Sequence, residues 1–561
     1  MSIFGSLGIG TRGLAASQLA LNVAGQNISN ANTEGYSRKR LEMSASTQLD
    51  PRYGEMGFGV EIEKVSRYTD IFLETQIRNQ MTDSGYYSML EQALERVENI
   101  LTEPTDMGLN ESIDKFWNAW QDMANNPDNM ASREVVKSTA IVLTDKFHTL
   151  SSQLEDLRLS KDEDIEGRIN EINGITQEIF NLNNEVAVGE LRGGEANDSR
   201  DKRDMLVREL SKIIDVDVVE DELGAITITT AGNVLVGPAT VIPLELQRTT
   251  SVDESGMPVS EVVIRFSNTK KDYMPRGGEL KGLFNVRDQV IPRYEGVLDE
   301  MATSFVNSVN SLHFTGYNLK QNTGVNFFDA EGTTAKTIQV GAAILSDVQN
   351  IAAASGGVTQ GVQIDGISEP LSVVPPQLSP QLDLKSMDSE YRNIVQGSMQ
   401  VTRNGAVLQE GAGLDYVVDY QFGTIAFLNY AKYSAGDSLD ITFRYNDAGY
   451  PGPGDGSNAL RIAQIRDQLI MDDDGIGNPT KTIGEFYAGA IGALGVERSQ
   501  SRTTMETRDF LVDQFEARKL EISGVSLDEE LANMIRFEHT YQASARYITV
   551  INEILDTLIN L

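Results

Sequence analysis

The residues of this chain that could carry catalytic or metal chemistry are few and scattered. There is no cysteine, which excludes disulfides, thiol nucleophiles and cysteine-ligated metal sites. The three histidines, His148, His313 and His539, lie on separate predicted helical segments, without a second nitrogen or sulfur ligand nearby in the sequence. A hydrolytic triad is not excluded by this count, but no Gly-x-Ser-x-Gly elbow supports one. We therefore expect no catalytic site and no enzyme activity.

Two stretches resemble ligand-binding motifs only in their letters. The glycines of residues 8–13 match a dinucleotide fingerprint, which requires a strand before it and a βαβ unit around it. A row of leucines at helical spacing follows instead. Counting a calcium loop from Asp472 places Ile476 and Ile483 at the fifth and twelfth positions, where oxygen ligands are needed. A solvated acidic turn is the better interpretation, so we expect no cofactor and no metal ion.

Size and charge restrict the class of protein and its partners. A chain of 561 residues with 40% hydrophobic residues is long enough for three or four domains. Its 47 basic and 82 acidic residues give a net charge of −35, which repels nucleic acid and anionic membrane surfaces. No apolar stretch of about 20 residues appears, and residues 1–10 lack the pattern of a cleavable signal peptide. We expect a soluble protein that, if exported, leaves without a cleaved signal.

The elements that could position an interaction site are the two ends of the chain. Apolar residues recur every seven positions near the N-terminus, at Leu7, Leu14, Leu21 and Ile28. Near the C-terminus a 3–4 spacing predicts a second amphipathic helix, which Ser526 and Glu529 would begin as a capping box. Its apolar positions are Leu527, Met534, Phe537, Tyr541, Ile548, Ile551, Leu555 and Leu558.

Two interpretations of these terminal helices fit the pattern equally well. They could pair with each other and cap an ordinary core, because core helices show the same periodicity. Alternatively they could pack against other subunits, since a single helix cannot bury its own apolar stripe and isolated helices are marginal in water. The pattern alone does not choose between these interpretations.

The interior predicts a multidomain α+β fold. A terminal α-helical coiled-coil layer encloses a long-helix bundle domain, into which central β-rich modules are inserted. Long helices are predicted over 68–101, 112–159, 162–184, 201–214 and 280–312. Short β-type runs are predicted between 216 and 266 and between 361 and 445, including a hairpin that turns at Asn404-Gly405. The expected domains are 1–45 with 526–561, 46–214 with 277–355 and 450–525, 215–276, and 356–449.

One segment after the first helix is highly specific. Residues 27–38 read Asn-Ile-Ser-Asn-Ala-Asn-Thr-Glu-Gly-Tyr-Ser-Arg and include Asn32, Gly35 and Tyr36. Asn and Gly accept left-handed backbone conformations, so the segment is a helix stop after which Tyr36 anchors the chain. It resembles the N-terminal signature of bacterial flagellar axial proteins of the rod, hook and hook-associated families. Residues 524–530, 541–546 and 555–561 resemble the matching C-terminal signature.

Three interior stretches narrow the resemblance to the hook-associated protein 1 family. They are residues 116–133, residues 197–206, and residues 277–328 with their Gly-Gly-Glu-Leu-Lys-Gly-Leu opening. The resemblance covers 1–355 and 450–561, and the segment between them resembles an insertion that varies within the family.

The resemblance implies a structural subunit at the extracellular junction between flagellar hook and filament. It implies that the terminal segments are unstructured in the free exported monomer and become paired helices on assembly. The implied partners are copies of the same chain in a ring, the hook protein, a second hook–filament junction protein, and a cytoplasmic export chaperone at the C-terminal segment. Nucleic acid and membrane are not expected as partners.

Two rival functions remain open at this stage. The chain could be a hook or rod subunit of the same axis, which is the same class of protein at another position. It could also be a secreted enzyme displayed on a helical stem, which would require polar side chains converging in a pocket of residues 361–445. The sequence offers no motif for such a pocket.

Overall fold

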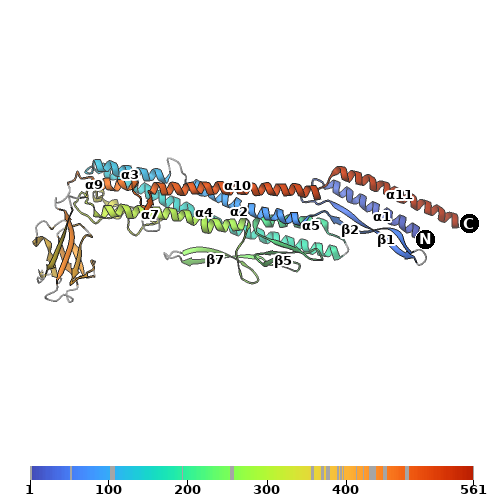
Figure 1. Ribbon diagram of the computed structural model, residues 1–561, viewed down its shortest axis with the longest axis horizontal. Helices are drawn as coiled ribbons and strands as arrows, with labels where there is room; N and C mark the ends of the chain where they lie inside the picture. Colours follow the sequence, from blue (N-terminus) through green and yellow to red (C-terminus); the bar gives the residue numbers. More distant parts are fainter. Residues whose placement is uncertain are drawn as a thin grey trace. The chain divides into compact units, whose positions relative to one another are not determined.

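The computed structural model (Figure 1) describes residues 3–50, 54–101, 108–191, 194–252, 258–355, 359–367, 372–373, 380–387, 391, 394–395, 397–411, 414–420, 423–428, 438–446, 452–473 and 479–559. By its packing the chain divides into two compact units. Unit 1 comprises Met1–Glu95, Arg158–Val290 and Val496–Leu561, and unit 2 comprises Arg96–Leu157 and Ile291–Gly495. The multidomain α+β class expected from the sequence is confirmed. The four-part domain boundaries stay a prediction.

The two ends of the chain lie together in unit 1. Helix α1 (Ile3–Ser29) packs against helix α11 (Leu527–Ile559), and both termini lie at one end of this pair (Figure 1). The antiparallel hairpin of β1 (Lys39–Asp50) and β2 (Gly54–Arg67) packs against α1. Both terminal helices form where the apolar periodicity predicts them. The first and the last helix of the chain therefore pack side by side.

Long helices make up much of the remaining chain. They are α2 (Ile71–Leu101), α4 (Met130–Leu191), α5 (Asn197–Ile213) and α10 (Ile483–Ser523). The sequence predicts at least one helix over 112–159 and a further helical stretch over 162–184, and a single helix of 62 residues, α4, joins the second range to most of the first. The polar run at 161–164 does not end it, since Lys161 Nζ contacts Asp164 Oδ2 across one helical turn at 2.6 Å.

Ion pairs hold α2 and α10 in antiparallel register within unit 1. Arg498 contacts Glu91 at 3.3 Å and Glu95 at 2.7 Å, near the C-terminal end of α2. Near the other end of α2, Lys519 contacts Glu74 at 3.0 Å. These contacts place the end of α10 beside the start of α2.

Two antiparallel sheets in unit 1 cover one face of α4. The first contains β3 (Asp217–Glu220), β4 (Ile226–Thr230), β5 (Asn233–Gly237) and β6 (Thr240–Val241), and the second contains β7 (Leu244–Val252), β8 (Pro258–Phe266) and β9 (Asp272–Tyr273). Isoleucines of α4 at 3–4 spacing form a core with these strands and with α5 and α6 (Gly278–Asn285). They are Ile165, Ile169, Ile172, Ile175 and Ile179.

An aromatic cluster forms the core of unit 2. It joins α3 (Leu109–Asn125) to α7 (Ile291–Thr315), which follows a π-helical turn (Val286–Val290), and short helices α8 (Ala342–Ser346) and α9 (Ser457–Ala463) also belong to this unit. The ring of Trp117 stacks on Phe305 with centroids 4.7 Å apart. Both tryptophans are core residues, because each is at most 2% exposed.

A β-rich module belongs to unit 2 and has a core of its own. Two four-stranded sheets share it, in the orders β10-β17-β13-β14 and β11-β12-β16-β15. The predicted turn at Asn404-Gly405 joins β13 to β14, with φ of 49° and 82° as a type I′ turn requires. The strands are β10 (Thr359–Ile367), β11 (Ser372–Val373), β12 (Pro380–Asp383), β13 (Gln400–Arg403), β14 (Ala406–Val407), β15 (Tyr416–Asp419), β16 (Thr424–Phe427) and β17 (Leu439–Asn446). A further hairpin pairs β18 (Met471–Asp473) with β19 (Pro479–Lys481).

His313 is a structural residue of the unit 2 core. It is fully buried, and its Nδ1 contacts the carbonyl of Val325 at 2.6 Å. Its Nε2 accepts a hydrogen bond from the amide of Ala352 at 2.8 Å, so the ring is neutral with its proton on Nδ1. Burial lowers the pKa of His313 from 6.5 to about 4. A second proton would bring Nε2–H against the amide N–H of Ala352.

This geometry predicts an acid-sensitive unit 2 core. Because the pKa of His313 is depressed by folding, its contribution to stability is complete above pH 6.5 and is lost as the pH falls towards 4. We expect the loss to be about 3 kcal/mol at pH 4 relative to pH 7.5. The chain's two tryptophans both lie in this core, so urea unfolding followed by tryptophan fluorescence measures it.

The matched variants are His313→Gln and His539→Gln, the latter on an exposed position of α11. The wild-type chain and His539→Gln should share the same pH dependence of the unfolding midpoint. The dependence should flatten in His313→Gln, and an unchanged slope in that variant would contradict the assignment.

Candidate functional site

Three sequence stretches that carry the family resemblance meet in space in unit 1. They are residues 27–39 from the last turn of α1 onwards, residues 198–205 of α5, and residues 523–530 from the end of α10 to the first turn of α11. We call this meeting point the terminal junction. The chain reaches it three times, so it fixes how the terminal helices leave the rest of unit 1.

Asn27 is the centre of the terminal junction. It is 1% exposed, and its amide nitrogen donates to the carbonyl of Lys39 at 2.9 Å and to Oε2 of Glu530 at 3.2 Å. Its amide oxygen accepts from the hydroxyl of Tyr36 at 2.8 Å and from the backbone N–H of Lys39 at 3.0 Å. One side chain therefore joins the end of α1, the start of β1 and the first turn of α11.

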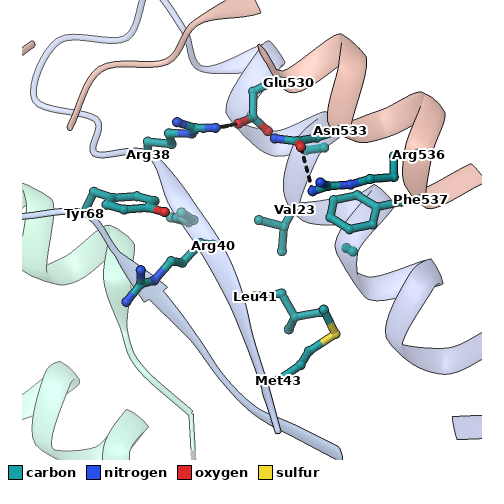
Figure 2. Close-up of a pocket in the computed structure, with 13 residues that line it drawn as sticks. Val23, Arg38, Arg40, Leu41, Met43, Tyr68, Glu530, Asn533, Arg536 and Phe537 are labelled. Atoms are coloured by element: carbon teal, nitrogen blue, oxygen red, sulfur yellow. Dashed lines mark hydrogen bonds and ion pairs between the residues drawn. The ribbon is translucent and has the colours of Figure 1, made fainter. Parts of the chain in front are cut away.

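Arg38 forms the second connection to α11. Its Nη2 lies 2.7 Å from Oε1 of Glu530, and its Nη1 lies 2.8 Å from Oε2 of Glu529. Figure 2 shows the Arg38–Glu530 pair at one edge of a pocket. The Glu530 side chain is 4% exposed, so its charge is stable there only because Arg38 and Asn27 both contact it.

The α5 stretch supplies acids that hold residues 35–39. Asp201 accepts from the backbone N–H of Ser37 at 3.1 Å, and Asp198 pairs with Lys39. Burial, and then the charges of Asp198, Asp201 and Glu530, raise the pKa of Tyr36 to about 12, so its hydroxyl keeps the proton that it donates to Asn27.

Glycine is required at position 35 by the backbone conformation and by the close approach of Met205. Its φ is +75°, and a Cβ added there would lie 2.1 Å from Sδ of Met205 in α5. The turn predicted from the Asn- and Gly-rich segment is therefore present, and it is packed against the second resembling stretch.

The predicted capping box of α11 is half formed. Ser526 Oγ accepts from the backbone N–H of Glu529 at 3.4 Å, as an N-cap residue does. The carboxylate of Glu529, which a capping box would direct back to Ser526, contacts Arg38. The start of α11 is thus set by the terminal junction as well as by its own cap.

The seam between α1 and α11 is lined on the α1 side by small residues that α11 approaches closely. A Cβ at Gly10 would lie 2.6 Å from Cγ1 of Ile548, and one at Gly13 would lie 3.0 Å from Oγ of Ser544. The buried α1 residues continue this row to Asn27, which contacts Glu530. They are Ala16, Ser17, Ala20, Val23 and Ala24. The two helices are therefore antiparallel and closely spaced.

The residues predicted as an interface occupy several environments. On α1, the four heptad residues are half-buried beside the small-residue seam: Leu7, Leu14, Leu21 and Ile28. On α11, the 3–4 stripe is half-buried on the face towards α1: Met534, Phe537, Tyr541, Ile548, Ile551 and Leu555. Leu527 is 49% exposed, and the side chain of Leu558 lies outside the described residues. Their role between subunits stays a prediction.

Asn32, Gly35 and Tyr36 line a groove of about 660 Å³ with the end of α10 and the start of α11. Sequence reasoning missed the small-residue seam, Arg38 and the acids of α5. The glycines and alanines at 3–4 spacing from Gly10 to Ala24 were the available signal for the seam.

Nothing in the described residues suggests bound metal or a membrane span. No group of three or more His, Asp or Glu side chains among them could hold a metal ion. No helix in that part of the chain is both long and apolar enough to cross a bilayer. Gly8, Gly10 and Gly13 lie within α1, so the strand that a dinucleotide site needs is replaced by helix.

Three family models match parts of the chain. The model described as "Flagellar hook-associated protein FlgK helical domain" matches residues 94–328. Those described as "Flagella basal body rod protein" and "Flagellar basal body rod FlgEFG protein C-terminal" match residues 7–36 and 517–561. The last two matches contain most of α1 and all of α11.

Curated relatives extend the likeness to the full length. Flagellar hook-associated protein 1 of Bacillus subtilis is 27% identical over 574 residues, covering 100% of this chain and 98% of that protein. The protein of the same name from Escherichia coli is 27% identical, covering 98% of each chain. This chain belongs to the flagellar hook-associated protein 1 family. Members of this family are structural proteins rather than enzymes.

Two further comparisons match this chain to a hook protein and to a solved structure. The hook protein FlgE of Helicobacter pylori is 29% identical over 133 residues, which is 23% of this chain. The solved structure of the flagellar hook junction protein FlgK from Burkholderia pseudomallei matches with a TM-score of 0.57 at 18% identity, covering 80% of this chain and 100% of that one. The second likeness shows a shared fold.

The terminal junction predicts a specific effect of removing Asn27. Asn27→Ala would leave the Tyr36 hydroxyl, the Lys39 amide and the Glu530 carboxylate without their shared partner. We expect it to destabilise the docked α1–α11 pair by ~2–4 kcal/mol. Hydrogen exchange of α1 and α11 amides, measured by mass spectrometry on subunits in isolated flagella, tests this.

Asn32→Ala is the matched control, because Asn32 belongs to the same segment but its side chain is exposed. Its effect on the same amides should stay within about 0.5 kcal/mol. Equal loss of protection in both variants would show that Asn27 is not the centre of the junction.

Proposed function

We propose that this chain is the extracellular structural subunit that joins the flagellar hook to the filament, and that it assembles with its neighbours through α1 and α11. Membership of the hook-associated protein 1 family and the fold shared with a hook junction protein support the position in the flagellum. The observation that carries the mechanism is that α11 exposes large apolar side chains which α1 does not cover.

One face of α11 is directed at α1, but further large apolar side chains of α11 are left exposed. Ile535 is 54% exposed, Val550 is 50% exposed and Ile554 is 45% exposed. Leu527, Leu531 and Tyr547 add exposures of 49%, 45% and 39%. Exposed apolar side chains gathered on a helix already packed on one side mark a further interaction surface, and no described helix qualifies as a membrane span. Other protein chains are therefore the partners that this face requires.

The size of the effect is sufficient for assembly. Six large apolar side chains, each about half exposed, would contribute roughly 5–9 kcal/mol per subunit when a neighbour covers them. Helix α1 favours the same environment, because its 27 residues include one arginine and no acid. Stacking such helices brings little like-charge repulsion into the interface, although the whole chain carries −35.

We assign four partners to these surfaces. Copies of this chain in a ring cover α1 and α11, the hook protein lies on one side, and a second hook–filament junction protein lies on the other. A cytoplasmic export chaperone covers the apolar C-terminal segment before assembly. The alternative of a hook or rod subunit is less well supported, because the likeness to hook protein covers 23% of the chain whereas the hook-associated relatives cover nearly all of it.

The position in the flagellum is tested by removing the gene. Electron microscopy should show hooks without filaments, and flagellin should accumulate unpolymerised in the medium. Absence of hooks would move the protein to the hook or rod. Intact filaments would contradict the proposed function.

The assembly mechanism is tested by placing charge on the outer face of α11. The double variant Ile535→Asp/Ile554→Asp should lower the amount of subunit in isolated flagella about tenfold or more, because two buried carboxylates would lack partners. The exported subunit should be recovered from the medium, which separates failed assembly from failed export.

Asn552→Asp/Thr549→Asp is the control, since it adds the same charge at exposed polar positions of α11. It should assemble close to wild type. If both double variants assembled normally, the outer face of α11 would not be an interface.

A further inference from the structure

A pocket of about 250 Å³ lies between α1, β1 and α11 (Figure 2). Val23, Leu41, Met43 and Phe537 supply apolar lining. Arg40 from β1 and Arg536 from α11 lie on either side of these residues in the view of Figure 2. The pocket therefore suits a side chain with an aliphatic stem and an anionic end.

Arg536 is the cation of this pocket that lacks an acidic partner. Its Nη2 donates to Oδ1 of Asn533 at 2.9 Å, and its guanidinium lies 5.2 Å from the centroid of the Phe537 ring. Within the described part of the chain, no carboxylate lies within ion-pair distance of it. These two contacts hold the exposed guanidinium in place but leave most of its donors available.

The other basic residues of the pocket differ in how far they are neutralised. Arg38 contacts both Glu529 and Glu530, and Lys39 is buried against Asp198. Arg40 is 52% exposed, pairs with Glu42 at 2.9 Å and lies over the ring of Tyr68 at 4.8 Å. Arg40 and Arg536 are thus the cations that an incoming anion can reach.

An exposed acid lies in the turn that follows α1. Glu34 is exposed and has no ion pair within the described residues. It lies in a rigid turn, in which the N–H of Thr33 donates to Asn30 O at 2.9 Å, the N–H of Tyr36 donates to Thr33 O at 3.2 Å, and Gly35 packs on Met205. The turn presents the Glu34 carboxylate at a fixed position, which lowers the entropic cost of docking it.

We propose that the pocket receives the Glu34 side chain of a neighbouring copy, with Arg536 as its principal ion-pair partner and Arg40 as its second. This inference rests on the proposed function, since it names the contact by which copies of the chain recognise one another. Two copies that each carry −35 repel, so their contact needs local attraction, and an unneutralised arginine beside an apolar wall provides it.

The donor and acceptor surfaces consist of different residues, so the contact is heterologous. A heterologous contact repeats from copy to copy and generates a ring or a helical stack, whereas a self-complementary one ends at a dimer. The same turn that ends α1 therefore also sets the direction in which copies add.

Charge reversal tests the pairing in the full chain. Glu34→Lys and Arg536→Glu should each lower the subunit recovered in isolated flagella about tenfold or more, because attraction becomes repulsion. The double variant Glu34→Lys/Arg536→Glu should restore most of the loss. Arg546→Glu is the control, since Arg546 is an exposed cation of α11 that does not line the pocket, and combining it with Glu34→Lys should restore nothing.

Cross-linking provides a second measurement, for which the cysteine-free chain is well suited. Copies carrying only Glu34→Cys are co-assembled with copies carrying only Arg536→Cys and treated with a short bismaleimide. A cross-linked dimer must then join two different copies. We expect it with Arg536→Cys and not with Arg546→Cys.

The outcomes separate this inference from the proposed function. Three results would overturn the Glu34–Arg536 contact: both single reversals assemble normally, the double reversal does not restore assembly, or the cross-link is absent. Incorporation of the wild-type chain would still support the proposed function in each case. Failure of the wild-type chain to enter the flagellum would overturn the function itself.

Discussion

One constraint determines the structure at the two ends of the chain. All polar groups buried at the terminal junction must have hydrogen-bond or ion-pair partners. Asn27 and Glu530 are each at most 3% exposed and lie against each other. Leaving one such group unpaired costs about 1–3 kcal/mol, and more for a charged one. Because the Asn27 contacts come from Tyr36, Lys39 and Glu530, only one arrangement of α1, β1 and α11 satisfies them together. The antiparallel register of the two helices, the start of α11 and the position of the Glu34 turn all follow from it.

Periodicity predicted the elements of the fold well, because the apolar side chains that fill a core are also those that a sequence displays. The terminal helices are examples, and the Asn404-Gly405 turn was predicted from its residue types. The sequence did not show that the helical ranges ending at 159 and beginning at 162 belong to one uninterrupted helix, α4. There, Lys161 contacts Asp164 within the helix, and such a local pair is not visible in the alternation of apolar and polar residues.

The candidate site was predictable only in part, for a physical reason. The stripe from Met534 to Leu555 does face α1, and the Gly35 turn is present. The partner surface on α1, however, consists of glycine and alanine, whose contribution is close approach rather than apolar area. Asn27 resembled a helix-stop residue in the sequence. Its role as a hydrogen-bond centre depends on Glu530, and no local pattern connects two such distant positions.

The large distance in sequence between Asn27 and Glu530 affects the order in which the chain can fold. Asn27 and Glu530 are 503 positions apart, and synthesis from the N-terminus releases α1 early and α11 last. Pairing them closes nearly the whole chain into a loop, which is entropically costly until the intervening units have folded and shortened the path. Helix α1 therefore has no α11 to pair with until translation is complete, and the two helices can pair only after that. A chain truncated before Glu530 cannot form the Asn27–Glu530 contact, so the terminal junction forms only when the C-terminal helix is present.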